Sequence, residues 1–193
     1  MITIMKNKIK TINILKVLNI LLYIFYIFSV GFFIVKYKYN YSLICAGCII
    51  GTYLLRVGNK KYGYLFNDLL IIMIDLFIMF SLALGTSYGL YKINHYDDFL
   101  HIWSGFIAST VAFVVINVFT EQEDRKNLKK AFLFIFIFMF SMAVASLWEI
   151  LEFTIDQIWA INCQAGGLND TMIDMIDGLV GTTIITPFLI RKL

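Results

Sequence analysis

Six long apolar runs divide this chain of 193 residues, and they constrain its fold more than any other feature. An apolar run of about 20 residues can cross a membrane as a helix, because each helical residue adds about 1.5 Å. The runs cover residues 17–35, 41–55, 66–88, 99–119, 131–155 and 171–190. We therefore predict an all-α, polytopic membrane helix bundle with about six transmembrane helices, which forms a single integral membrane domain over residues 1–193.

The composition agrees with this class of protein. Hydrophobic residues make up 60% of the chain, and proline occurs once, whereas soluble domains contain roughly 45–50% apolar residues. The first run is followed by KYKYNY rather than by the small residues of a signal-peptide cleavage site, so we predict that this helix is retained. We expect a multi-pass protein of a bacterial cytoplasmic membrane, with membrane lipids as its partners.

The basic residues predict how the bundle is oriented. Of the sixteen lysines and arginines, all but three fall on one side of the membrane when the six runs are followed along the chain. The exceptions are Lys36, Lys38 and Lys92. Because cytoplasmic loops are enriched in Lys and Arg, we predict that both termini are cytoplasmic. The basic residues thus mark topology, and we predict no nucleic-acid partner. The oligomeric state stays open.

Acidic residues gather on the opposite, outward side. Eight of the thirteen acids and both histidines belong to the outward ends of the last three runs. These acids are Asp97, Asp98, Glu149, Glu152, Asp156, Asp170, Asp174 and Asp177. A carboxylate in the middle of a membrane costs roughly 2.5–3.5 kcal/mol on insertion scales, so such groups face protein, water, a cation or one another. We therefore predict a shared polar cavity that opens outward.

The spacing of these residues places them on single faces of their helices. Asp97 precedes His101 by four residues, and Glu149 and Glu152 are three residues apart. Residues at these separations lie on one helix face. The last run repeats the spacing at Asp170, Asp174 and Asp177. Two glycines that follow them, Gly178 and Gly181, would let a neighbouring helix approach closely.

So many carboxylates in one place allow two explanations. Either several of them share protons, or a cation holds them. A histidine among carboxylates suits Zn²⁺ or Mn²⁺, while carboxylates alone suit Ca²⁺ or Mg²⁺. No H-E-x-x-H motif or other specific metal signature is present, so the identity of the ion stays open. Our hypothesis is a divalent metal ion whose ligands are His101, Glu149, Glu152 and Asp174.

The other acids receive different roles in this hypothesis. Asp98 or Asp177 would act as a general base beside the ion. Asp97, Asp156 and Asp170 are further site candidates. Asp170 also has a purely structural explanation, since an acid in the first turn of a helix interacts favourably with the helix dipole.

Three segments between residues 97 and 181 resemble a known membrane family. They read DDFLHIWSG, WEILEF and DTMIDMIDGLVG, and they resemble the core of the YjdF-like bacterial integral membrane proteins. They are more distantly similar to the VanZ-like family, whose pattern has an Asp four residues before a His, a Glu-x-x-Gln pair, and Asp-x-x-x-Asn-x-x-Gly-x-x-x-Gly. Glu152, Asp174 and Asp177 stand where that pattern has Gln, Asn and Gly, so this site is the more acidic. The resemblance implies a polytopic bacterial membrane protein and no particular reaction.

Three classes of function remain open. We favour a metal-assisted enzyme that acts on lipid or cell-envelope intermediates at the outer leaflet. The alternative is a cation- or proton-coupled transporter or solute-binding membrane protein, although no second half repeats the first as in many transporters. The third class is a structural lipid-binding or assembly partner with a buried polar network. Asp75, deep in the third run, would favour transport if it lined a path to the acidic residues.

Overall fold

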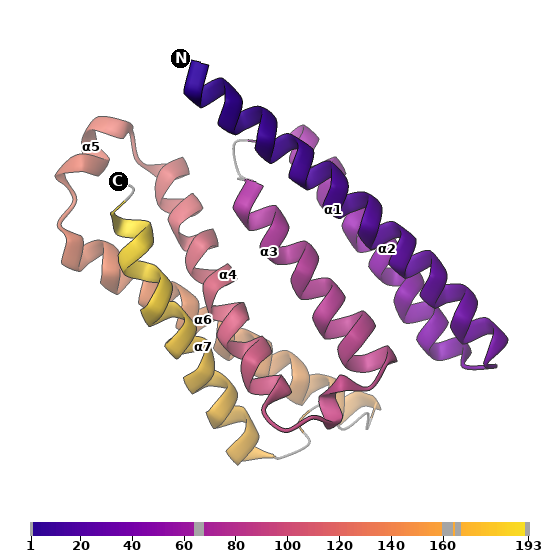
Figure 1. Cartoon of the computed structure of the whole chain (residues 1–193). Coiled ribbons are helices and arrows are strands. Elements are labelled where there is room, and N and C mark those ends of the chain that lie inside the picture. Colours follow the sequence, from indigo (N-terminus) through magenta and orange to yellow (C-terminus); the bar gives the residue numbers. More distant parts are fainter. Residues whose placement is uncertain (1, 64–67, 160–163, 165–166, 192–193) are drawn as a thin grey trace. The chain divides into compact units, whose positions relative to one another are not determined.

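The computed structural model describes residues 2–63, 68–159, 164 and 167–191, and it confirms an all-helical protein (Figure 1). The described part contains six helices that are long and apolar enough to cross a membrane. They are Leu15–Val35, Tyr39–Lys61, Asp68–Ser87, Tyr96–Phe119, Lys130–Trp159 and Leu168–Ile190. Residues 66 and 67 of the third predicted run lie outside the described residues. At most 44% of any of these apolar stretches is buried within the chain, which leaves large apolar surfaces of the kind that contact lipid or another protein.

The chain forms two compact units, Met1–Lys92 and Ile93–Leu193. The first contains α1 (Ile2–Val35), α2 (Tyr39–Lys61), α3 (Asp68–Ile78), the π-helix η1 (Met79–Ser87) and the 3-10 helix η2 (Leu90–Lys92). Its core joins α1, α2 and η1 through Leu22, Tyr26, Phe33, Cys45, Cys48 and Ala83. Tyr88 closes this core, because its ring stacks on Phe25 and its hydroxyl lies 3.0 Å from Ser29 Oγ.

A buried ion pair holds the helices of the first unit together. Arg56 of α2 donates to the carboxylate of Asp75 on α3, whose side chain is fully buried. The Nε of Arg56 also donates to Asn19 Oδ1 of α1 at 3.4 Å. The pair therefore connects three helices and compensates the charge of Asp75 within its own unit.

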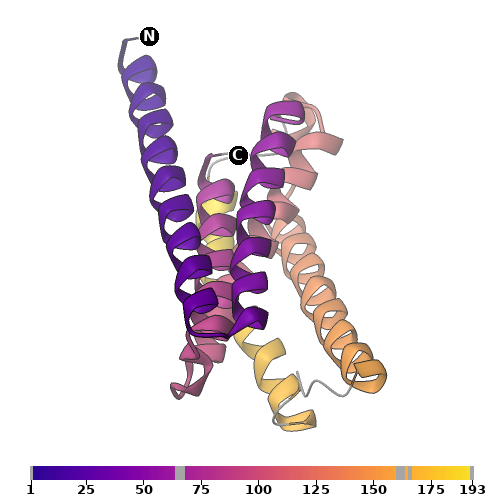
Figure 2. The ribbon, with the colours of Figure 1, turned by 90° about the vertical axis from the view of Figure 1, so that its right-hand side faces the viewer.

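The second unit contains α4 (Tyr96–Phe119), α5 (Gln122–Asn127), α6 (Lys130–Trp159) and α7 (Leu168–Ile190) (Figures 1 and 2). The short helix α5 forms within the charged segment between the fourth and fifth runs. Arg125 of α5 donates to the backbone carbonyl oxygens of Asn117 at 3.2 Å and Thr120 at 2.9 Å, and also to Asn117 Oδ1. It thereby satisfies backbone acceptors that the end of α4 leaves without helical partners. Ala112, Ile116, Leu133 and Ile137 form the core between α4 and α6.

Helices α4 and α7 touch backbone to backbone, as the glycine spacing predicts. A methyl group on Gly181 would lie 2.0 Å from the carbonyl oxygen of Ile102, and one on Gly105 would lie 2.1 Å from that of Gly178. Thr182 Oγ1 donates to the Gly178 carbonyl at 2.9 Å beside this contact. Only residues without a side chain permit such an approach. The crossing lies just past the acidic residues of both helices, so it fixes how those residues meet.

Candidate metal centre

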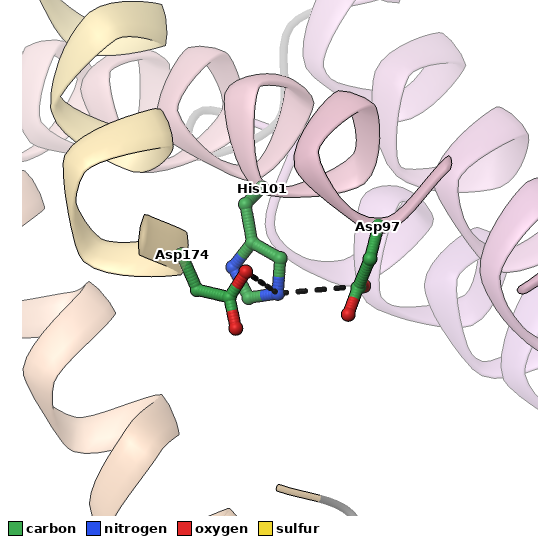
Figure 3. Close-up of side chains that lie close together, drawn as sticks. All are labelled: Asp97, His101 and Asp174. Carbon is green, nitrogen blue, oxygen red and sulfur yellow. Dashed lines mark ion pairs between the residues drawn. The ribbon is translucent and has the colours of Figure 1, made fainter. Parts of the chain in front are cut away.

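Three polar side chains from α4 and α7 converge beside the glycine crossing. Asp97 and His101 lie one turn apart near the start of α4, and Asp174 lies near the start of α7. His101 Nε2 is 3.6 Å from Asp97 Oδ1 and 3.7 Å from Asp174 Oδ1. Figure 3 shows the two carboxylates on either side of the imidazole ring. These separations are those of long ion pairs rather than of hydrogen bonds, and they place His101 Nε2 between the two carboxylates.

The geometry of this trio fits a metal ion with a small adjustment. The imidazole nitrogen and the two carboxylate oxygens all lie within 4.8 Å of one another. In the tetrahedral geometry that Zn²⁺ prefers, bonds of about 2.0–2.2 Å place neighbouring donors roughly 3.3–3.6 Å apart, close to the 3.6 and 3.7 Å that separate His101 Nε2 from the two carboxylate oxygens. Within the described ranges, no other group of three such residues meets this criterion. A site with one imidazole and two carboxylates suits Zn²⁺ or Mn²⁺.

The charge around the trio also favours a cation. Asp174 is buried, and the negative charges of Asp97, Asp170, Glu149 and Glu152 all act on it. Among the residues that the structure describes, no lysine or arginine forms an ion pair with any of these five carboxylates. His101 is the cationic partner that the structure gives to Asp97 and Asp174, and one imidazolium is too little charge for five carboxylates, so further protons or a bound cation would compensate the rest.

Glu149 and Glu152 lie outside this group. Both belong to α6, where Glu149 is buried and Glu152 is half-buried. Glu149 lines a cavity between α6 and α7 instead. The structure thus brings together two of the four predicted ligands, His101 and Asp174, and adds Asp97, which was predicted only as a further site candidate. Whether Glu149 and Glu152 bind an ion stays a prediction.

The two candidate bases differ in their surroundings. Asp98 Oδ2 lies 2.6 Å from Nδ1 of His95, an exposed residue that precedes α4. Sequence reasoning missed this pair, although the three-residue spacing of the two was visible. Asp177 interacts electrostatically with Asp97, Asp98 and His101. Its Oδ2 is buried and has no hydrogen-bond partner in the described part of the chain. Asp177 is therefore, like Glu149, a carboxylate near the trio with a buried oxygen that has no donor among the described residues.

Asp156 and Asp170 lie outside the trio and differ in their surroundings. Asp156 Oδ2 accepts a hydrogen bond from the backbone N–H of Gln164 at 2.9 Å, which anchors the connection after α6. The Gln164 side chain in turn donates to Thr171 Oγ1 of α7 at 2.9 Å. Asp170 is half-buried in the first turn of α7, where Gly167 is the N-cap. Its position suits the dipole of α7, and its charge also reaches Asp97 and Asp174.

These features define a multi-pass membrane protein with an Asp/His/Asp cluster at the crossing of two helices. The model of a family described as "Predicted membrane protein (DUF2238)" matches residues 17–193, and the chain belongs to this family. The match includes every residue of the candidate site. No curated protein and no solved structure matches the chain.

Proposed function

We propose that this protein is a metal-assisted enzyme of the membrane that acts on lipid or cell-envelope intermediates. The observation that carries the proposal is the convergence of Asp97, His101 and Asp174 from two helices that glycines hold in contact. A divalent ion in this position would polarise a phosphoryl or ester oxygen, or lower the pKa of a bound water. Such a site inside a transmembrane unit is accessible to substrates dissolved in lipid.

The remaining acids support the chemistry of the ion. We assign the role of general base to Asp177, because its buried oxygen has no hydrogen-bond partner among the described residues. It would take a proton from the attacking water. Asp98 is the less suitable base, since His95 occupies one of its oxygens. Glu152 would add negative charge next to the ion.

We propose that the site faces outward from a bacterial cytoplasmic membrane, with both termini cytoplasmic. The start of α4 and the start of α7 lie at one end of the second unit, and α5 lies at the other end (Figure 1). The segment around α5 carries Arg125, Lys126, Lys129 and Lys130. Basic residues favour the cytoplasmic side, which supports an outward position for the acidic end.

We also infer that the family is related to the YjdF-like proteins and, more distantly, to the VanZ-like proteins. The support is that the matching segments carry the metal trio. Asp97 and His101 match the first VanZ-like element, and Asp174 stands where that pattern has an asparagine. A carboxylate in place of a neutral amide would strengthen the binding of a cation.

Transport has less support than enzymatic activity. The residue that favoured transport in the sequence is Asp75. In the structure its side chain is fully buried and paired with Arg56 inside the first unit. The ion pair explains this acid without a pathway. If the protein is a structural lipid-binding or assembly partner, the trio holds no ion. A measurement of metal binding therefore distinguishes this class from the enzyme.

Turnover of a lipid tests the proposal. We expect wild-type protein loaded with Zn²⁺ or Mn²⁺ to convert a component of a bacterial lipid extract, with the product detected by mass spectrometry. Asp177→Asn should slow the reaction by about 100-fold or more, the usual contribution of a general base. Asp124→Asn, the same change in exposed α5, is the matched control. Absence of any turnover by metal-loaded protein would contradict the enzyme and leave a binding or transport role.

A further inference from the structure

A cavity of about 560 Å³ lies between α6 and α7, separate from the metal trio. Its walls are largely apolar, with Ile150 and Phe153 from α6 and Leu168 and Met175 from α7. Ile150, Phe153 and Leu168 are also exposed, so the cavity opens on a surface that a membrane would cover. A cavity of this composition suits a hydrocarbon chain.

One polar side chain in the wall lacks a partner. Glu149 is only 5% exposed, and its Oε2 has no hydrogen-bond donor among the residues described. The nearby amide of Gln164 is already engaged, because it donates to Thr171 Oγ1 and to the backbone carbonyl of Glu149. A buried carboxylate oxygen without a donor is unfavourable. Glu149 also lines the cavity, so a molecule bound there is placed to supply the missing donor once the carboxylate turns toward it.

The surrounding charge restricts what that molecule can be. Glu149 lies among carboxylates, and no lysine or arginine in the described ranges forms an ion pair with it. An anionic headgroup would be repelled, and a quaternary ammonium has no N–H to donate. A primary ammonium offers both the hydrogen-bond donor and the opposite charge.

We propose that this cavity binds a membrane lipid with a primary ammonium headgroup, its chain between α6 and α7 and its ammonium on Glu149. The assignment of this lipid as the substrate of the adjacent metal centre rests on the proposed function. Its binding in the cavity does not require the ion. The inference names the substrate class as an aminophospholipid, whose phosphoryl and ester oxygens are groups that a metal ion can polarise.

Native mass spectrometry of the detergent-solubilised full chain tests this binding, with excess EDTA present so that no metal contributes. Phosphatidylethanolamine and phosphatidylcholine with identical acyl chains are the probes, because they differ only at the headgroup nitrogen, which carries three N–H donors in the first and three methyl groups in the second. We expect wild-type protein to bind phosphatidylethanolamine at least about tenfold more tightly, as a charge-assisted hydrogen bond implies. Glu149→Gln should bring the two affinities together, while the exposed control Glu123→Gln should keep them apart.

A second variant tests the cavity without changing Glu149. Met175→Trp places a larger side chain in the cavity and should weaken the binding of both lipids by about tenfold or more, since it removes room for the chain. Equal affinities in wild-type protein, a preference that survives Glu149→Gln, or full binding by Met175→Trp would each overturn the proposal. Because EDTA is present throughout, these results are independent of metal binding. A lack of metal binding would overturn only the proposed function.

Discussion

Replacing Asp174 by asparagine is expected to lower the affinity for Zn²⁺ or Mn²⁺ by at least about 100-fold, since even partners outside the metal's own ligands contribute 10–100-fold. Asp174 is buried and provides the only trio carboxylate on α7, 3.7 Å from His101 Nε2. Asparagine keeps the shape and one oxygen but removes the charge that holds the cation. Isothermal titration of metal-free protein measures the change.

The control for this variant is Asp124→Asn in exposed α5, which should bind metal as wild type does. Asp97→Asn should have a smaller effect than Asp174→Asn, because the Asp97 side chain is 44% exposed and water can replace its oxygen. Circular dichroism shows whether each variant keeps its helices. Unchanged affinity in folded Asp174→Asn protein would remove Asp174 from the ligands.

Replacing Arg56 by methionine is expected to lower the free energy of unfolding by about 3–5 kcal/mol, the usual cost of leaving a buried charge without its partner. Asp75 is fully buried, and Arg56 is the cation that compensates it. Methionine keeps much of the apolar length of the arginine side chain, so the loss of packing is small. Equilibrium unfolding in mixed micelles with increasing SDS measures the change.

The double variant Arg56→Met, Asp75→Leu separates charge from packing. Well-packed apolar residues can replace a buried ion pair at little or no cost, so the double variant should regain most of the stability that Arg56→Met loses. Asp75→Leu alone should cost less than Arg56→Met, because Arg56 is partly exposed and can extend toward water. A double variant as unstable as Arg56→Met would show that the pair does not act through charge.

The sequence predicts the helices of this protein well, because apolar length is a direct consequence of the membrane as solvent. It predicts their ends less well. Helix α6 continues to Trp159, beyond the predicted end at residue 155. Asp156 lies in this extra turn, and its carboxylate accepts the backbone N–H of Gln164. Hydropathy reports burial in lipid and contains no information on such a hydrogen bond.

The candidate site shows the same limit. The four-residue spacing of Asp97 and His101 is enough to place them on one face of α4. Hydropathy predicts how deep Glu149 and Glu152 lie in the membrane. It does not predict the rotation of α6 about its axis, and this rotation places Glu149 in the wall of the cavity. Asp174 meets His101 because Gly105 and Gly181 let two backbones touch. The glycines of α7 predict that a neighbouring helix comes close. They do not predict which residue of that helix each glycine contacts.

The metal content of the purified protein shows whether Asp97, His101 and Asp174 hold an ion. Elemental mass spectrometry would be applied to wild type, His101→Ala and Glu149→Gln after identical dialysis. We predict near-stoichiometric divalent metal in wild type and its loss in His101→Ala, while the metal content of Glu149→Gln measures whether Glu149 is a further ligand. Wild-type protein without metal, or full retention of metal in folded His101→Ala protein, would contradict a centre built from Asp97, His101 and Asp174.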